Sequence, residues 1–168
     1  SRAYRRPASE REVERLSGLA EHGLEQGGGF QAGIAAAMEA LLVSPHFLFK
    51  VELDPHPDDP RAIRPLDDYE LATRMSYFIW SSMPDDELTE HARNGTLDGS
   101  LDSQIRRMLA GPRARALTEH FAGQWLQLGR LKSAEPDRQL FPEFDDGLLE
   151  DMRTETGMFL AAIVAEDR

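Results

Sequence analysis

The chain has 168 residues, of which 40% are hydrophobic and 29% charged, and its formal net charge is −11. This composition is typical of a globular protein with a hydrophobic core, and the acidic balance argues against binding to nucleic acid or to anionic lipid surfaces. The chain contains no cysteine. Disulfides, thiolate nucleophiles, cysteine zinc sites and covalent c-type haem attachment are therefore excluded within this segment.

The charge is unevenly distributed. Residues 1–15 hold five arginines and three acids, whereas residues 16–168 carry a net charge of −13. The cluster of Arg2, Arg5 and Arg6 is interpreted mainly as a charged chain terminus, with contact to an acidic partner as the alternative. No apolar run approaches the ~18 residues of a membrane span, and no signal peptide is visible. Because the chain also lacks an initiator methionine, we expect it to be a piece of a longer protein.

Residues 1–54 are predicted to form a helical hairpin module. Ser9 and Glu12 have the spacing of a capping box, in which each side chain binds the other residue's amide at a helix start. Apolar residues follow at helical spacing until the Gly27–Gly29 triplet, which favours a turn over a phosphate loop because no strand precedes it. A second stripe over 30–43 should pack back on the first helix. The run 46–49 fits either a brief strand or a helical turn.

A polar connector rich in proline, residues 55–65, is predicted to separate this hairpin from a second helical module at 66–168. Asp67 is a good N-cap for a helix that should bury Leu71, Met75, Phe78 and Ile79. Further helices are expected over about 84–93, 101–109, 113–128 and from 145 onwards. The fold is therefore predicted to be all-α, with two small packed modules and about seven helices, the second module being truncated at its C-terminus.

The helix predicted over 113–128 carries the most informative side chains. Ala114, Leu117, Phe121, Trp125 and Leu128 share one face, which predicts that Trp125 anchors the core. His120 and Gln124 lie beside this stripe at positions i and i+4. A polar pair at the margin of a core must be hydrogen-bonded, so the pair should either hold a neighbouring loop or line a pocket. These two residues are the weak candidates for a catalytic site.

Other polar pairs have simpler explanations. Glu87 and His91 could reach one metal ion, but two ligands do not make a zinc site, and we expect no metal site. Glu70 and Arg74 are spaced for a structural salt bridge on one helix. Adjacent acids such as Asp85-Asp86 stand at helix starts, where they interact favourably with the helix dipole. The sequence shows no nucleophile elbow, Walker loop or calcium loop, and no residue is expected to bind a cofactor.

Several segments resemble a known family. Residues 2–7 and 44–52 resemble one small domain of the planctomycete-type multidomain cytochrome c proteins. Residues 69–85, 121–126 and 141–145 resemble the next domain in those proteins. The similarity covers nearly the whole chain, and the motif at 69–85 is specific.

The resemblance implies two adjacent domains of unknown function in an exported protein of the periplasm or cell envelope. Any haem would be bound in other parts of the parent protein, and the expected partners are the other domains of the same polypeptide, with no nucleic acid and no membrane insertion. We therefore expect a structural or interaction module of a larger exported, cytochrome c-linked protein that is not an enzyme by itself. The alternative is part of an envelope hydrolase or oxidoreductase whose active site needs further domains.

Overall fold

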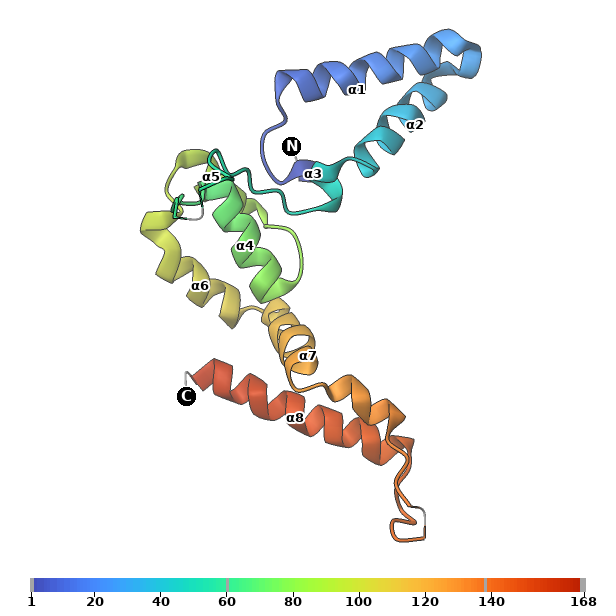
Figure 1. The fold of residues 1–168 in the computed structure, drawn as a ribbon, viewed down its shortest axis with the longest axis vertical. Helices are drawn as coiled ribbons and strands as arrows, with labels where there is room; N and C mark the ends of the chain where they lie inside the picture. The colour runs from blue at the N-terminus through green and yellow to red at the C-terminus, as the bar shows by residue number, and fades with distance from the viewer. Residues whose placement is uncertain (1, 60, 138, 167–168) are drawn as a thin grey trace.

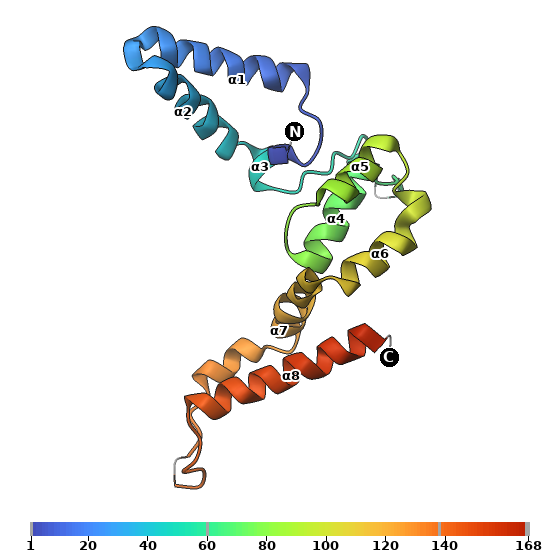
Figure 2. The same ribbon diagram turned by 180° about the vertical axis from the view of Figure 1, so that it is seen from behind.

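The structure, a computed structural model, describes residues 2–59, 61–137 and 139–166. The predicted modules and connector also include Ser1, Pro60, Arg138, Asp167 and Arg168, which lie outside the described residues. Within the described ranges the chain is all-α and forms no strand, as predicted. The helices form three groups along the long axis of the molecule: the α1–α2 hairpin, the α4–α6 group, and α8 with the segment before it (Figures 1 and 2).

The N-terminal group is a hairpin of α1 (Glu10–Gly23) and α2 (Gly29–Leu42), joined by the wide π-helical turn η2 (Leu24–Gly28). The Ser9–Glu12 capping box predicted at the start of α1 is present. The two helices approach through glycine, since a Cβ on Gly23 would lie 2.8 Å from the Cα of Gly33. The short helix α3 (Pro45–Leu48) follows, which decides the run at 46–49 in favour of a helical turn.

The predicted helix over 30–43 is present and packs back on α1, but most of its apolar stripe is exposed. Phe30 is 72% exposed and Met38 is 57% exposed, and Ile34 and Leu42 on the same stripe are also exposed. The close contact with α1 is made instead at Gly33, which is the buried residue of α2.

The hydrophobic core lies among α4 (Asp68–Trp80), α5 (Asp86–Asn94) and α6 (Leu101–Ala110). Its fully buried side chains include Leu88, Leu97 and Met108. Trp80 is buried among them and donates a hydrogen bond of 3.0 Å from its indole nitrogen to the Met108 carbonyl. Phe78, predicted to be buried, is instead 60% exposed.

The C-terminal group consists of four short helical pieces and one long helix. The short pieces are η4 (Pro112–Ala114), the π-helical segment η5 (Leu117–Ala122), α7 (Gly123–Trp125) and η6 (Leu128–Ser133). The helix α8 (Asp146–Glu166) runs back along η5 and η6 (Figure 1). No described residue of α8 is buried. Two further 3-10 turns, η1 (Arg2–Tyr4) and η3 (Asp98–Ser100), complete the fold.

The prediction that Trp125 is a core residue is wrong, because Trp125 is 68% exposed. The buried residues of this segment are Thr118 and Ala122, each one position after a member of the predicted stripe. A π-helical turn has i to i+5 hydrogen bonds and more residues per turn than an α-helix. The segment therefore turns Phe121 and Trp125 off the buried face.

Candidate functional site

His120 and Gln124 both line a cavity of about 680 Å³ between the segment 115–132 and α8. Both side chains are exposed, so they lie in an open cavity and not at the margin of a core. Part of the cavity wall is glycine: a Cβ on Gly123, Gly129 or Gly157 would meet no other atom within 4 Å. The carboxylates of Glu119 and Glu150 also line the cavity.

His120 is tied to the end of α4. Its Nδ1 lies 2.8 Å from the Oγ of Ser81, the residue that caps the C-terminus of α4. Ser81 has a left-handed backbone with φ of 51°, which is uncommon for a residue other than glycine. The contact thus holds the π-helical segment against the end of α4, which is the structural role considered for His120.

The cavity does not assemble a catalytic triad from the described residues. A serine–histidine pair needs a third group that orients the imidazole. The two acids that line the cavity have other partners, because Glu119 is bound by Arg115 at 2.5 Å and Glu150 by Arg153 at 3.7 Å. No group of three or more acids and histidines among the described residues could hold a metal ion.

An exposed aromatic face lies beside this cavity. It consists of Phe78 on α4, Phe121 on η5 and Trp125 on α7, which are 60%, 52% and 68% exposed. The ring centroids of Phe78 and Phe121 are 6.1 Å apart, and Phe121 stacks on Trp125 at 6.1 Å with 20° between the planes. Exposed apolar patches of this kind are typical of surfaces that contact other molecules.

Two copies of one local motif occur in the chain, one before α1 and one before α4. Arg6-Pro7 precedes the capping box of α1 and Arg64-Pro65 precedes that of α4, so the pattern is Arg-Pro-x-Ser/Asp-x-x-Glu in both. Each arginine donates a hydrogen bond to the carbonyl of the proline that follows it. Each also donates to both carboxylate oxygens of the glutamate: Arg6 to Glu12 at 2.9 and 2.7 Å, and Arg64 to Glu70 at 2.6 and 3.1 Å.

These bonds lower the pKa of both glutamates. The hydrogen bonds from Arg6, assisted by those from Ser9, lower the pKa of Glu12 to about 2. Burial acts to raise the pKa of Glu70, but the hydrogen bonds from Arg64 and from the Asp67 amide outweigh it, and the pKa is lowered. Both carboxylates therefore stay ionised and bonded at neutral pH.

The predicted salt bridge between Glu70 and Arg74 is replaced by two other pairs. Glu70 binds Arg64, while Arg74 donates from Nε and Nη2 to the two oxygens of Glu52 at 2.6 and 2.5 Å. Glu52 precedes the connector and Arg74 is on α4, so this pair joins the two modules. The spacing rule for helices failed here because a residue outside the helix offered Arg74 a bidentate partner.

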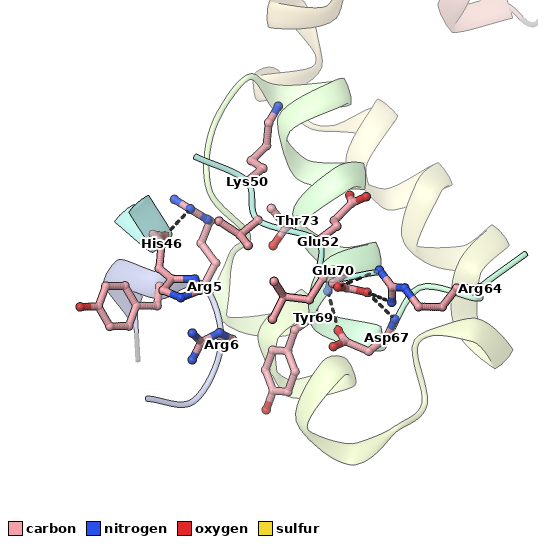
Figure 3. A pocket seen from close by; sticks show the side chains of 13 residues that line it. Arg5, Arg6, His46, Lys50, Glu52, Arg64, Asp67, Tyr69, Glu70 and Thr73 are labelled. Carbon is pink, nitrogen blue, oxygen red and sulfur yellow. Dashed lines mark hydrogen bonds and ion pairs between the residues drawn. The ribbon is translucent and has the colours of Figure 1, made fainter. Parts of the chain in front are cut away.

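A smaller cavity of about 230 Å³ lies at this junction. In Figure 3, Arg5 and Arg6 lie on one side of it and Tyr69 and Thr73 of α4 on the other. Arg5 has a left-handed backbone with φ of 57° and donates to the carbonyls of His46 and Phe49 at 2.8 and 2.6 Å. These bonds fasten the N-terminal segment to the end of α3.

Glu87 and His91 do not bind each other directly. Instead, both contact the side-chain amide nitrogen of Gln104. This nitrogen donates to a carboxylate oxygen of Glu87 at 2.8 Å and lies 3.2 Å from Nε2 of His91. Arg107 donates to the oxygen of the Gln104 amide at 2.9 Å, which fixes the orientation of that amide. The pair therefore belongs to a polar network that connects α5 to α6.

The sequence predictions missed both the junction cavity and the aromatic face. The repeated Arg-Pro-x-Ser/Asp-x-x-Glu pattern was a usable signal for the junction, because an arginine three positions before an N-cap can reach the N3 glutamate. No local signal marks the aromatic face, because it depends on the π-helical turn in η5.

Two family models match the chain. Residues 66–168 match PSD4, Protein of unknown function (DUF1592), and residues 1–52 match PSD5, Protein of unknown function (DUF1595). The 13 residues between the matches include the predicted connector. No curated protein and no solved structure gave a match to the chain.

Proposed function

The chain belongs to the family of proteins of unknown function DUF1592, and on that basis we propose that it is a helical interaction module whose exposed apolar faces are covered by other domains of a larger polypeptide. We further propose that this polypeptide is exported to the periplasm or cell envelope and is linked to a cytochrome c. The resemblance of residues 69–85 to planctomycete-type cytochrome c proteins supports that part of the proposal.

The observation that carries the proposal is the accessible surface. The chain exposes 12544 Å². A compact monomer of 18.9 kDa exposes about 8,300 Å² by the usual scaling with mass. The excess, roughly 4,000 Å², is several times the ~800 Å² that each partner buries in an interface of standard size.

The apolar side chains are exposed in three places that a partner domain can cover. These are the α2 stripe with Phe30 and Met38, the aromatic face with Trp125, and α8 with Phe159. Since two different domain families already occur in this one chain, we assign the covering surfaces to further domains of the same polypeptide. No helix of the described residues is long and apolar enough to cross a membrane.

The test compares the full-length parent protein with a version that lacks this segment. Haem content and oxidoreductase activity are measured in both, together with hydrogen exchange of α2 and α8 in the full-length protein. In the full-length protein we expect slow hydrogen exchange on both helices. When the segment is deleted, we expect the remaining domains no longer to pack together. Exchange as fast as in the isolated segment would contradict the proposal.

One observation favours a second candidate, part of an envelope enzyme. The cavity of about 680 Å³ contains His120 and Gln124 together with the carboxylates of Glu119 and Glu150. Such a set provides a base and hydrogen-bonding groups for a substrate. Under this candidate His120→Ala abolishes an activity of the full-length protein without changing its assembly, whereas under the first candidate it does not.

A further inference from the structure

The junction cavity is built from both modules. Tyr4, Arg5, Arg6 and Lys50 come from the hairpin module, and Tyr69 and Thr73 come from α4 (Figure 3). Tyr4 and Thr73 are 6% and 8% exposed, so the cavity has a buried floor. The cavity therefore exists only when the hairpin module is docked on α4.

The carboxylates at this cavity already have hydrogen-bond partners. Both oxygens of Glu52 accept hydrogen bonds from Arg74, and both oxygens of Glu70 accept from Arg64. Asp67 accepts from the Glu70 amide at 2.7 Å, as the N-cap of α4. Glu52 and Glu70 are thus neutralised by arginines, which reduces their repulsion of an anion in the cavity.

The donors at the cavity are not saturated. The hydrogen bonds of Arg5 and Arg6 use only the terminal nitrogens, which leaves the Nε groups open. The hydroxyl of Thr73 makes no hydrogen bond with any described residue. Lys50 also lines the cavity; its Nζ lies 4.8 Å from the centroid of the Tyr77 ring and has no carboxylate partner in the described chain. Among the described residues, the fully buried side-chain polar atom without a hydrogen-bond partner is the Tyr4 hydroxyl. The Thr73 hydroxyl is therefore still accessible, and it can bond a ligand in the cavity.

We propose that the junction cavity binds the oxyanion group of a small molecule, either a carboxylate or a phosphate. The oxyanion accepts hydrogen bonds from Thr73 and from the open guanidinium nitrogens, and the ammonium of Lys50 supplies charge. The cavity of about 230 Å³ has room for roughly seven waters, so the ligand is small. This site lies apart from the exposed apolar faces and does not depend on the function proposed above.

A neighbouring cavity extends the same basic surface. It measures about 220 Å³ and shares Arg5, Arg6 and Tyr69 with the junction cavity. It adds Arg2 and Arg93, which are paired with Asp86 and Glu90. The chain as a whole carries a charge of −11, so an anion is repelled from most of its surface. Saturable binding of an anion therefore requires a local basic site such as this one.

The test uses the 168-residue chain and measures its thermal unfolding temperature at pH 7 with increasing inorganic phosphate or succinate. Sodium chloride at matched ionic strength is the control for screening. A ligand that binds only the native state raises the unfolding temperature in a saturable way. A rise with phosphate alone assigns a phosphate site, and a rise with succinate alone assigns a carboxylate site. No saturable rise beyond that in sodium chloride overturns the proposal.

Variants then locate the site. Lys50→Met and Thr73→Val should each weaken anion binding by about tenfold or more, which corresponds to about 1.4 kcal/mol. Lys50 is exposed and the Thr73 hydroxyl has no partner, so both variants should fold, as far-ultraviolet circular dichroism checks. The matched control is Lys132→Met, which removes an ammonium from the cavity beside α8. Equal losses in the Lys50 and Lys132 variants would show diffuse attraction and overturn the site.

Discussion

Arg74 holds Glu52 with two hydrogen bonds, of 2.6 and 2.5 Å, across 22 residues of sequence. The side chain of Glu52 is 28% exposed and that of Arg74 is 60% exposed. Together with the hydrogen bond of 3.5 Å from Arg5 to the hydroxyl of Tyr77 on α4, this pair ties the hairpin module to the α4–α6 group. Substitutions of Glu52 and Arg74 therefore test how the two modules are held together.

A double-mutant cycle with Glu52→Gln and Arg74→Gln should give a measurable coupling energy that decreases as salt is added. The coupling should exceed that of Asp102 and Arg106, a pair on one helix whose side chains are 81% and 79% exposed. Urea denaturation of the four proteins in each cycle measures both values. Equal coupling in the two cycles would show that the bidentate contact adds nothing to the fold.

Glu12 should make the fold sensitive to acid. Its pKa is about 2 in the folded chain, against an ordinary value of 4.5, because Arg6 donates hydrogen bonds to its carboxylate. A lowered pKa adds stability above the unfolded pKa, and this stability is lost as the pH falls from about 4.5 towards 2. The full shift corresponds to about 3 kcal/mol, but Arg6 is 34% exposed, so we expect about 1–2 kcal/mol after solvent screening.

Urea denaturation between pH 7 and pH 2 measures this loss. Glu12→Gln should be less stable than the original chain at pH 7 and should lose less stability on acidification. Glu14, which is exposed on α1, provides the matched control through Glu14→Gln, whose acid response should follow that of the original chain. Identical pH profiles for the Glu12 and Glu14 variants would contradict the assignment.

The two tryptophans should differ sharply in their effect on stability. Trp80 is 6% exposed and donates to the Met108 carbonyl, so Trp80→Ala should cost ~3–5 kcal/mol through lost burial and a cavity. Trp125 is 68% exposed, and Trp125→Ala should cost less than about 1 kcal/mol. Chemical denaturation distinguishes them. A loss at Trp125 as large as that at Trp80 would mean that the aromatic face is internal.

The hairpin should depend on Gly33. A Cβ on this residue would collide with the carbonyl oxygen of Ala20 on α1, so Gly33→Ala should push the helices apart and cost about 1–3 kcal/mol. Gly18→Ala is the control, since a Cβ there meets nothing within 4 Å. It should stabilise α1 by about 0.5–1 kcal/mol, because glycine is a poor residue within a helix. Thermal unfolding of the two variants should therefore shift in opposite directions.

Features set by local chemistry could be predicted from the sequence. Ser9 and Asp67 start helices because each caps amides within its own turn, and that requires no other part of the chain. The all-α class follows in the same way from apolar spacing along each segment. These predictions were made from residues at most a few positions apart.

Features that depend on distant residues could not be predicted. Arg74 had an acid within reach on its own helix, and only the folded chain brings Glu52 to it. The π-helical turn in η5 displaced the buried face of its segment by one residue, which turned Trp125 outwards. His120 and Gln124 line a cavity whose opposite wall belongs to α8. The position of α8 cannot be predicted from the residues around His120, because α8 is distant in the sequence.

Because glycines form part of the wall of the cavity beside α8, single substitutions can change the shape of this cavity. Side chains added at Gly123, Gly129 or Gly157 would grow into empty space and not into the backbone. Related chains can therefore differ in what fits this cavity while they keep the same helices and the same charges. The contour of the cavity is a property that can diverge within the family faster than its fold.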